Sequence, residues 1–136
     1  MSVLEIGTGV VAFEKELYAY SGLVDFSAGG TGDERIALDF TSPQGYFKCD
    51  VAVNMDSGSW ADADILGTIM RLNGQNVYLN KFAITPQTLG QAQLVSPFSV
   101  ILPPNTRVKF IFQFSSGTAM VGSGAVVLTG REIGRP

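Results

Sequence analysis

Alternation of apolar and polar residues is the strongest pattern in this 136-residue chain. In Arg107–Ser115 every second side chain is a large apolar one, with Ile111 as the only exception, and Arg35–Thr41 and Tyr46–Asp56 repeat the pattern. A period of two residues is typical of strands with one buried and one solvated face, as in antiparallel sheets. No segment of ten or more residues has helical spacing, so the pattern predicts an all-β protein.

Short strands separated by Gly, Pro, Asn and Ser indicate an antiparallel β-sandwich or a barrel. Eight strands are predicted: Val10–Tyr20, Arg35–Thr41, Tyr46–Asp56, Ile65–Leu72, Val77–Ile84, Leu94–Leu102, Arg107–Ser115 and Ala119–Thr129. Asn73-Gly74 favours a type I′ turn and therefore a hairpin. We expect one domain over residues 10–131, preceded by an N-terminal arm (1–9) and followed by a tail (132–136).

Four features define the layout of the chain. The features are a short first strand ending in Leu17–Gly22, the Asn73-Gly74 hairpin, the Pro-containing entry Ile101–Phe110 and the closing strand Gly124–Arg131. Over roughly residues 8–131 they are similar to the single-jelly-roll virion proteins of tailed bacteriophages, of the capsid decoration and head-fibre types. Those proteins share their topology with the tumour-necrosis-factor-like trimers. The resemblance implies a jelly-roll sandwich that assembles as a homotrimer.

The same resemblance implies a role on a virus particle. We expect a decoration, or cement, protein that is made in the host cytoplasm. It would bind the outer capsid of a bacteriophage through contacts with the major capsid protein or other virion proteins. The alternative is a phage fibre, receptor-binding or carbohydrate-binding module, which would use the loops Ala28–Glu34, Ser57–Asp64 and Ser115–Met120.

Composition excludes several other functions. Histidine is absent and Cys49 is the only cysteine, which removes the commonest general base and metal ligands. We therefore expect no catalytic activity, cofactor or metal. The basic residues occur singly, which argues against nucleic-acid binding, and no stretch approaches the about 18 apolar residues that span a membrane. Charged residues reach 15%, against about 25% in typical proteins, so a partner is expected to cover part of the surface.

Candidate interface residues come from two segments and from the N-terminal arm. Ile65–Leu72 is apolar on both faces, so either its second row, with Leu66, Met70 and Leu72, meets another subunit, or the strand is central and a loop covers it. Tyr18 and Tyr20, like Tyr46 and Tyr78, fall at strand ends or on outward faces, where tyrosine serves interfaces or is simply exposed. The arm Met1–Gly9 precedes the first strand and could strap a neighbour.

Of four further residues or segments, two have two interpretations each and two have one. Trp60 either binds a sugar or a neighbouring protein, or folds back over its own sandwich. The loop with Asn54, Asp56, Asp62 and Asp64 either holds calcium or only faces water. Lys15 interrupts an apparently inward row, which would protect an edge strand from open-ended pairing. Cys49 alternates with core residues and is expected inside as a small apolar side chain.

Overall fold

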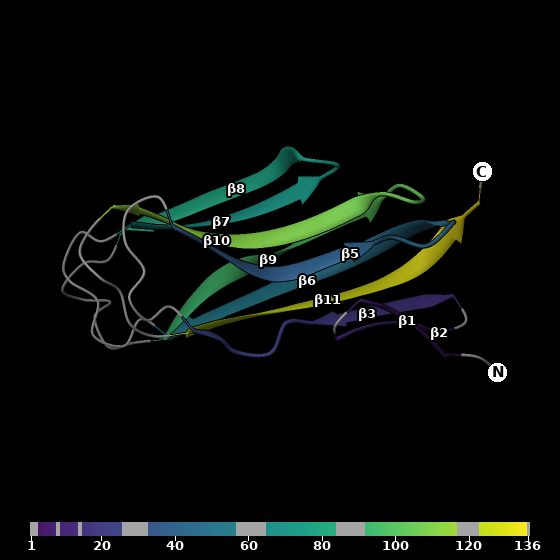
Figure 1. Ribbon diagram of the computed structural model, residues 1–136, viewed down its shortest axis with the longest axis horizontal. Coiled ribbons are helices and arrows are strands. Elements are labelled where there is room, and N and C mark those ends of the chain that lie inside the picture. Colours follow the sequence, from purple (N-terminus) through teal and green to yellow (C-terminus); the bar gives the residue numbers. More distant parts are fainter. Residues whose placement is uncertain are drawn as a thin grey trace.

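The computed structural model describes residues 3–7, 9–13, 15–25, 33–56, 65–83, 92–116 and 123–135. Within these ranges the chain forms strands and no helix, so no helix there is long and apolar enough to cross a membrane (Figure 1). The strands are β1 (Val3–Gly7), β2 (Val10–Phe13), β3 (Glu16–Tyr20), β4 (Val24–Asp25), β5 (Glu34–Thr41), β6 (Tyr46–Asp56), β7 (Ile65–Leu72), β8 (Gln75–Ala83), β9 (Ala92–Leu102), β10 (Arg107–Ser116) and β11 (Ser123–Gly134).

The strands form two antiparallel sheets that pack face to face. One sheet has the order β1-β2-β3-β11-β6-β9, with β4 also paired to β11, and the other has the order β5-β10-β7-β8. Figure 1 shows β8 and β7 of the four-stranded sheet at the top of the view and β11 and β3 of the larger sheet toward the bottom. From β3 onward the chain crosses repeatedly between the sheets, which gives the strand order of a jelly roll. The predicted fold class, an all-β antiparallel sandwich, is confirmed.

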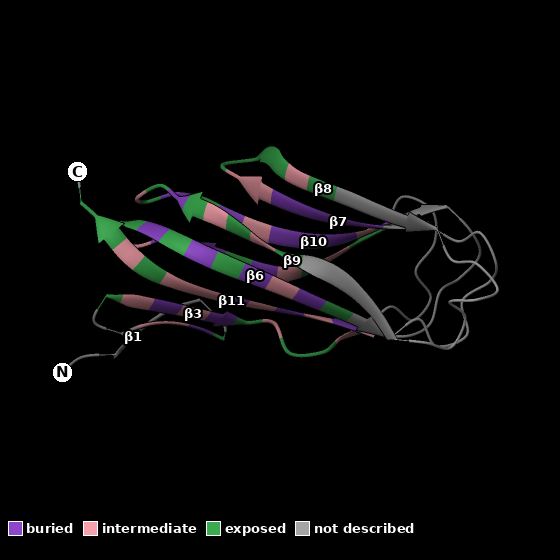
Figure 2. Ribbon diagram, turned by 180° about the vertical axis from the view of Figure 1, so that it is seen from behind, coloured by how far each residue is buried: buried purple, intermediate pink, exposed green. Residues whose placement is uncertain are grey.

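The core fills the space between the sheets. Figure 2 shows the alternation of buried and exposed residues along β6, which continues along the paired strands. The largest fully buried side chains of this core come from both sheets and include the row of phenylalanines predicted in β10: Phe47, Phe110, Phe112, Phe114, Leu17, Leu38, Met70 and Leu102. The inward position predicted for Cys49 is also confirmed, since its side chain is fully buried in this core.

The N-terminal segment differs from the expectation. The segment expected as one strand over Val10–Tyr20 is a hairpin of β2 and β3, with Lys15 exposed in the turn between them. The inward protective charge predicted for Lys15 is therefore wrong, because the turn changes the alternation. Residues 3–7 of the expected arm pair with β2 as β1, and β11 continues to Gly134 beyond the expected end of the domain.

Three turns at one end of the sandwich are fixed by hydrogen bonds (Figure 1). Asn73 and Gly74 have positive φ angles of 51° and 83°, as the predicted type I′ turn requires. The Asn73 side chain accepts a hydrogen bond of 2.9 Å from the backbone N–H of Arg107. The buried Ser42 hydroxyl donates to the carbonyl of Pro103 at 2.6 Å and accepts from the N–H of Thr106 at 2.9 Å. These bonds tie the β5–β6 corner to the β9–β10 turn.

Gly130 and Cys49 lie opposite each other on β11 and β6, facing the core. A Cβ atom at Gly130 would lie 2.5 Å from the Cys49 Sγ, which is closer than real contacts allow. We expect Gly130→Ala to lower the free energy of unfolding by about 1–3 kcal/mol, the usual cost of overpacking. The change is measured by urea denaturation.

Two further variants identify the cause. Gly134→Ala is the matched control, because no atom lies within 4 Å of a Cβ there, and we expect it to be close to neutral. The double variant Gly130→Ala/Cys49→Ala should lose less stability than the sum of its two single changes, because Cys49→Ala removes the clashing sulfur. Additive losses would contradict this steric explanation.

The burial of Cys49 also has a pH signature. Burial raises the pKa of its thiol to about 12, whereas a thiol in an unfolded chain titrates near 8.5. Between those values the unfolded chain releases a proton that the folded chain keeps, so the free energy of unfolding falls as the pH rises above about 9. We expect Cys49→Ala to lose this part of the pH dependence in urea titrations. Parallel pH profiles for the two proteins would contradict the expectation.

Candidate functional site

An apolar row crosses the outward face of the four-stranded sheet. Ile36 in β5, Ile111 in β10, Ile69 in β7 and Leu79 in β8 are direct neighbours in the strand register. The two outer members are more than half exposed, Ile36 at 53% and Leu79 at 54%. An outward sheet face is normally polar in a sandwich of this kind. An unbroken apolar row across all four strands therefore marks this face as a candidate contact surface.

Two irregularities in the strand register create this row. The pairing of β5 with β10 skips Ala37, so Leu38 faces the core opposite Phe110 while Ile36 is brought opposite the outward Ile111. On β8, Val77 is the extra residue of a bulge and is 50% exposed. We call Ile36, Ile69, Val77, Leu79 and Ile111 the apolar band. β-Bulges redirect side chains in this way without breaking the sheet.

The centre of the band is covered by an ion pair. Ile111 and Ile69 are only 1% and 3% exposed although they face away from the core. Arg71 pairs with Lys109, two residues before Ile111 on β10. Glu34 pairs with Gln113, two residues after Ile111. The Arg71 Nη2 and the Glu34 Oε2 are 3.1 Å apart, so the two side chains meet over Ile111. Gln113 donates a further hydrogen bond to the same Glu34 oxygen at 3.3 Å.

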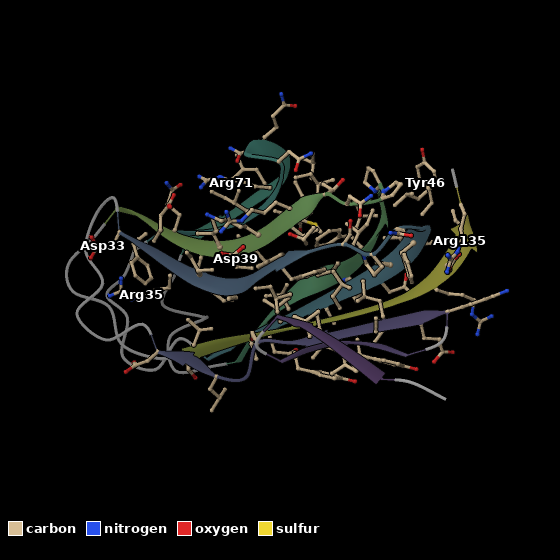
Figure 3. All side chains as sticks on the ribbon, turned by 45° about the vertical axis from the view of Figure 1, so that its right-hand side comes forward. Asp33, Arg35, Asp39, Tyr46, Arg71 and Arg135 are labelled. Carbon is tan, nitrogen blue, oxygen red and sulfur yellow. The ribbon has the colours of Figure 1, made fainter. Side chains whose placement is uncertain are left out.

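The band has a polar margin on its turn side. Arg107 donates two hydrogen bonds to the Asp39 carboxylate, at 3.0 and 2.9 Å. These hydrogen bonds, with a contribution from the charge of Lys109, hold the pKa of Asp39 below its usual value. Arg71 also donates to the Asn76 side chain at 2.8 Å. Figure 3 shows Arg71 and Asp39 on this part of the molecule. An apolar centre with a polar margin is the usual composition of a protein–protein interface.

Two of the predicted interface residues of β7, Met70 and Leu72, lie on its inward side. Met70 is fully buried in the core, and Leu72 packs against it. Leu66 belongs to β7, but its side chain lies outside the described residues. The structure therefore moves Met70 and Leu72 from the expected interface into the core, because Met70 faces Phe110 across the inward register. The outward apolar row of this strand is the one that contains Ile69.

The other candidate residues lie apart from the band. Tyr18 is half-buried and Tyr20 half exposed on the outward side of β3, in the other sheet. Tyr46 is exposed at the start of β6, whereas Tyr78 faces inward and stacks on Phe98 with ring centroids 3.8 Å apart. Tyr78 was expected at a strand end or on an outward face; it lies near the start of β8, and its side chain faces inward because the bulge at Val77 changes the alternation of that strand.

Several loop candidates fall outside the described residues. These are Trp60, Asp62 and Asp64, together with all or most of the loops Ala28–Glu34, Ser57–Asp64 and Ser115–Met120. Among the described residues, no group of three or more His, Cys, Asp or Glu is placed to hold a metal ion.

The sequence contained two signals for the band, at Ile111 and in Ile65–Leu72, which is apolar on both faces and includes Ile69. Ile111 was the single exception to alternation in β10, and an apolar residue on a solvated face indicates that something covers it. Ile36 gave no such signal, because in the sequence it belongs to the same alternating row as Leu38 and Phe40. Only the strand register shows the bulge that turns it to the outward face.

Comparisons with known proteins were made by sequence and by structure. No family model and no curated protein sequence matches the chain. Solved structures do match. One is infectious bursal disease virus strain Gx, with a TM-score of 0.58 and 14% identity, covering 98% of this chain and 37% of that chain. Another is the VP2 subviral particle of infectious bursal disease virus, with a TM-score of 0.53 and 11% identity, covering 97% and 37%.

A third match is the dimeric latent PorU of Porphyromonas gingivalis, with a TM-score of 0.50 and 12% identity over 94% of this chain and 14% of that chain. The chain thus spans well under half the length of the structures it matches. At these identities the likeness is one of fold alone. The chain shares a β-sandwich fold with a protein of viral particles.

Proposed function

We propose that this chain is a non-enzymatic structural protein of a virion, a decoration protein that binds the outer surface of a bacteriophage capsid as a homotrimer. The apolar band is the observation that carries the proposal, because it gives the folded chain an outward surface suited to a protein partner. The fold supports the proposal, since the VP2 subviral particle is built on a similar sandwich. The absence of histidine from the sequence supports a non-enzymatic role.

The band fits a contact with the capsid shell better than a contact within the trimer. Three of its side chains are about half exposed, and its centre is already covered by Arg71 and Glu34. Obligate subunit interfaces are large and mostly apolar, whereas smaller patches with polar margins are typical of partners that also exist apart. We therefore assign the band to the major capsid protein or another protein of the shell.

A packed contact of this kind would tie neighbouring shell subunits together. Burying the exposed parts of Ile36, Val77 and Leu79 supplies apolar free energy, and Arg107, Lys109 and Asp39 at the margin supply orientation. No bond is made or broken, so the proposed action is mechanical reinforcement of the shell.

The first test asks whether the chain is a component of virus particles and whether the isolated chain has the native mass of a trimer. In virus particles purified from the source that encodes the chain, peptide mass spectrometry should find it in many copies per particle. The isolated chain should sediment at about 43 kDa across a dilution series, three times the chain mass of 14.5 kDa. Absence from purified particles would overturn the virion role. A stable monomer at all concentrations would overturn the trimer.

The second test addresses the band. We expect Leu79→Glu to reduce rebinding to particles that lack the chain by at least about tenfold, because it places a charge on an exposed apolar member of the band that the contact would desolvate. The matched control is Ile101→Glu, since Ile101 is 52% exposed on the outward side of β9, in the other sheet. Both variants should keep the sedimentation of the unchanged chain. Equal rebinding of the two variants would contradict the assignment of the band.

A further inference from the structure

The outward face of the larger sheet contains a polar groove opposite the apolar band. The groove has a volume of about 270 Å³ and runs over β3, β11 and β6. Its charged and polar lining consists of Glu16, Tyr18, Lys48, Asp50, Thr129 and Arg131. We call these six residues the polar groove. They form two adjacent rows in the strand register, so rigid paired strands hold every one of them.

Part of the hydrogen-bonding capacity of the groove is used within the chain. Ser99 donates to the Asp50 Oδ1 at 2.7 Å and so orients this carboxylate from the neighbouring strand β9. The Tyr18 hydroxyl donates to the Glu16 carboxylate, and this bond raises the pKa of Tyr18, which keeps the phenol protonated. The Arg131 guanidinium lies 3.9 Å from Glu16.

The remaining hydrogen-bonding groups of the polar groove are available to a ligand. Among the described residues, the second oxygen of Asp50, the ammonium of Lys48 and the hydroxyl of Thr129 have no hydrogen-bond partner. Thr129 and Asp50 face each other across the β11–β6 pair, and Lys48 lies two residues before Asp50 on the same strand. The groove thus offers one acceptor, one charged donor and one hydroxyl within neighbouring register positions.

The charges of the groove balance. Two carboxylates, Glu16 and Asp50, are matched by two cations, Lys48 and Arg131. A balanced site does not concentrate phosphate or metal cations by its field, since charge selection needs an excess of one sign. The mixture of donors and acceptors instead suits a neutral ligand that carries many hydroxyl groups.

Two tyrosines add an apolar component beside these polar groups. Tyr18 lines the groove, and Tyr20 follows it on the same face of β3 with half of its surface exposed. Sugar rings have one face of C–H groups and an edge of hydroxyls, so they fit a tyrosine ring beside carboxylate and ammonium groups. A ligand with only polar groups, such as an inorganic ion, would leave the tyrosine rings unused.

We propose that the polar groove binds a neutral carbohydrate chain. Asp50 and Lys48 would bind ring hydroxyls, Thr129 would add a third hydrogen bond, and Tyr18 would pack against the ring. The groove is an open depression, and its volume of about 270 Å³ is slightly below the about 300 Å³ at the lower limit of ligand pockets, so it would hold one sugar unit. This inference goes beyond the proposed function and does not depend on it.

The test uses the isolated full-length chain on an array of immobilised neutral, acidic and sulfated oligosaccharides, followed by titration calorimetry with the strongest ligand. We expect binding to neutral oligosaccharides and at least a tenfold loss of affinity in Asp50→Asn. The matched control is Asp39→Asn, the same chemical change on the opposite face, which should keep full affinity. Tyr18→Phe should weaken binding less than Tyr18→Ala, because it keeps the ring. Urea denaturation verifies that each variant is folded.

Each other outcome overturns the inference. No binding to any neutral oligosaccharide removes the ligand class. Binding to acidic or sulfated chains alone shows an anion site built on Lys48 and Arg131. Neutral binding that Asp50→Asn leaves unchanged places the ligand elsewhere. Because the assay needs no virus particle, its failure is separate from a failure of the virion role, which rests on particle content and on the apolar band.

Discussion

The burial of the phenylalanine row of β10 is the constraint on which the rest of the structure depends. Phe110, Phe112 and Phe114 lie at the centre of the sandwich, and β10 itself is held between β5 and β7. Such bulky side chains stabilise the fold only if a second sheet closes over them. The crossings of the chain between the sheets supply that cover, with Phe47 and Leu102 contributed from the opposite side.

Alternation was sufficient to predict most of the sheet content and the bounds of β6, because that strand has one buried face and the pattern is local. The bounds of β7 were predicted from a segment that is apolar on both faces. Prediction from alternation failed where a local event changes the pattern, at the turn with Lys15 and at the bulges of β5 and β8. The candidate surfaces were mostly beyond prediction for a related reason. The band forms only because Ile36 and Leu79 lie in line with Ile111 and Ile69 across the sheet. That alignment depends on pairing between strands that are distant in the sequence.

The two outward faces of the sandwich have opposite character. One presents the apolar band, and the other presents the polar groove. Because the faces point away from each other, a chain attached to a surface through the first would display the second to the surroundings. The fold supplies this separation without any additional domain, since a sandwich two sheets thick has two independent faces. In this arrangement attachment and recognition would not compete for the same residues.

The ion pair of Arg71 and Glu34 over Ile111 gives the band a particular response to ionic strength. Dissolved salt screens charges at the surface, so it weakens the side chains that cover the centre of the band. Salts that are excluded from protein surfaces strengthen apolar contacts under the same conditions. A contact made through this band would therefore gain apolar area as the ion pair that covers its centre weakens. Such a contact would hold in concentrated salt, where an attachment built on surface charges would dissociate.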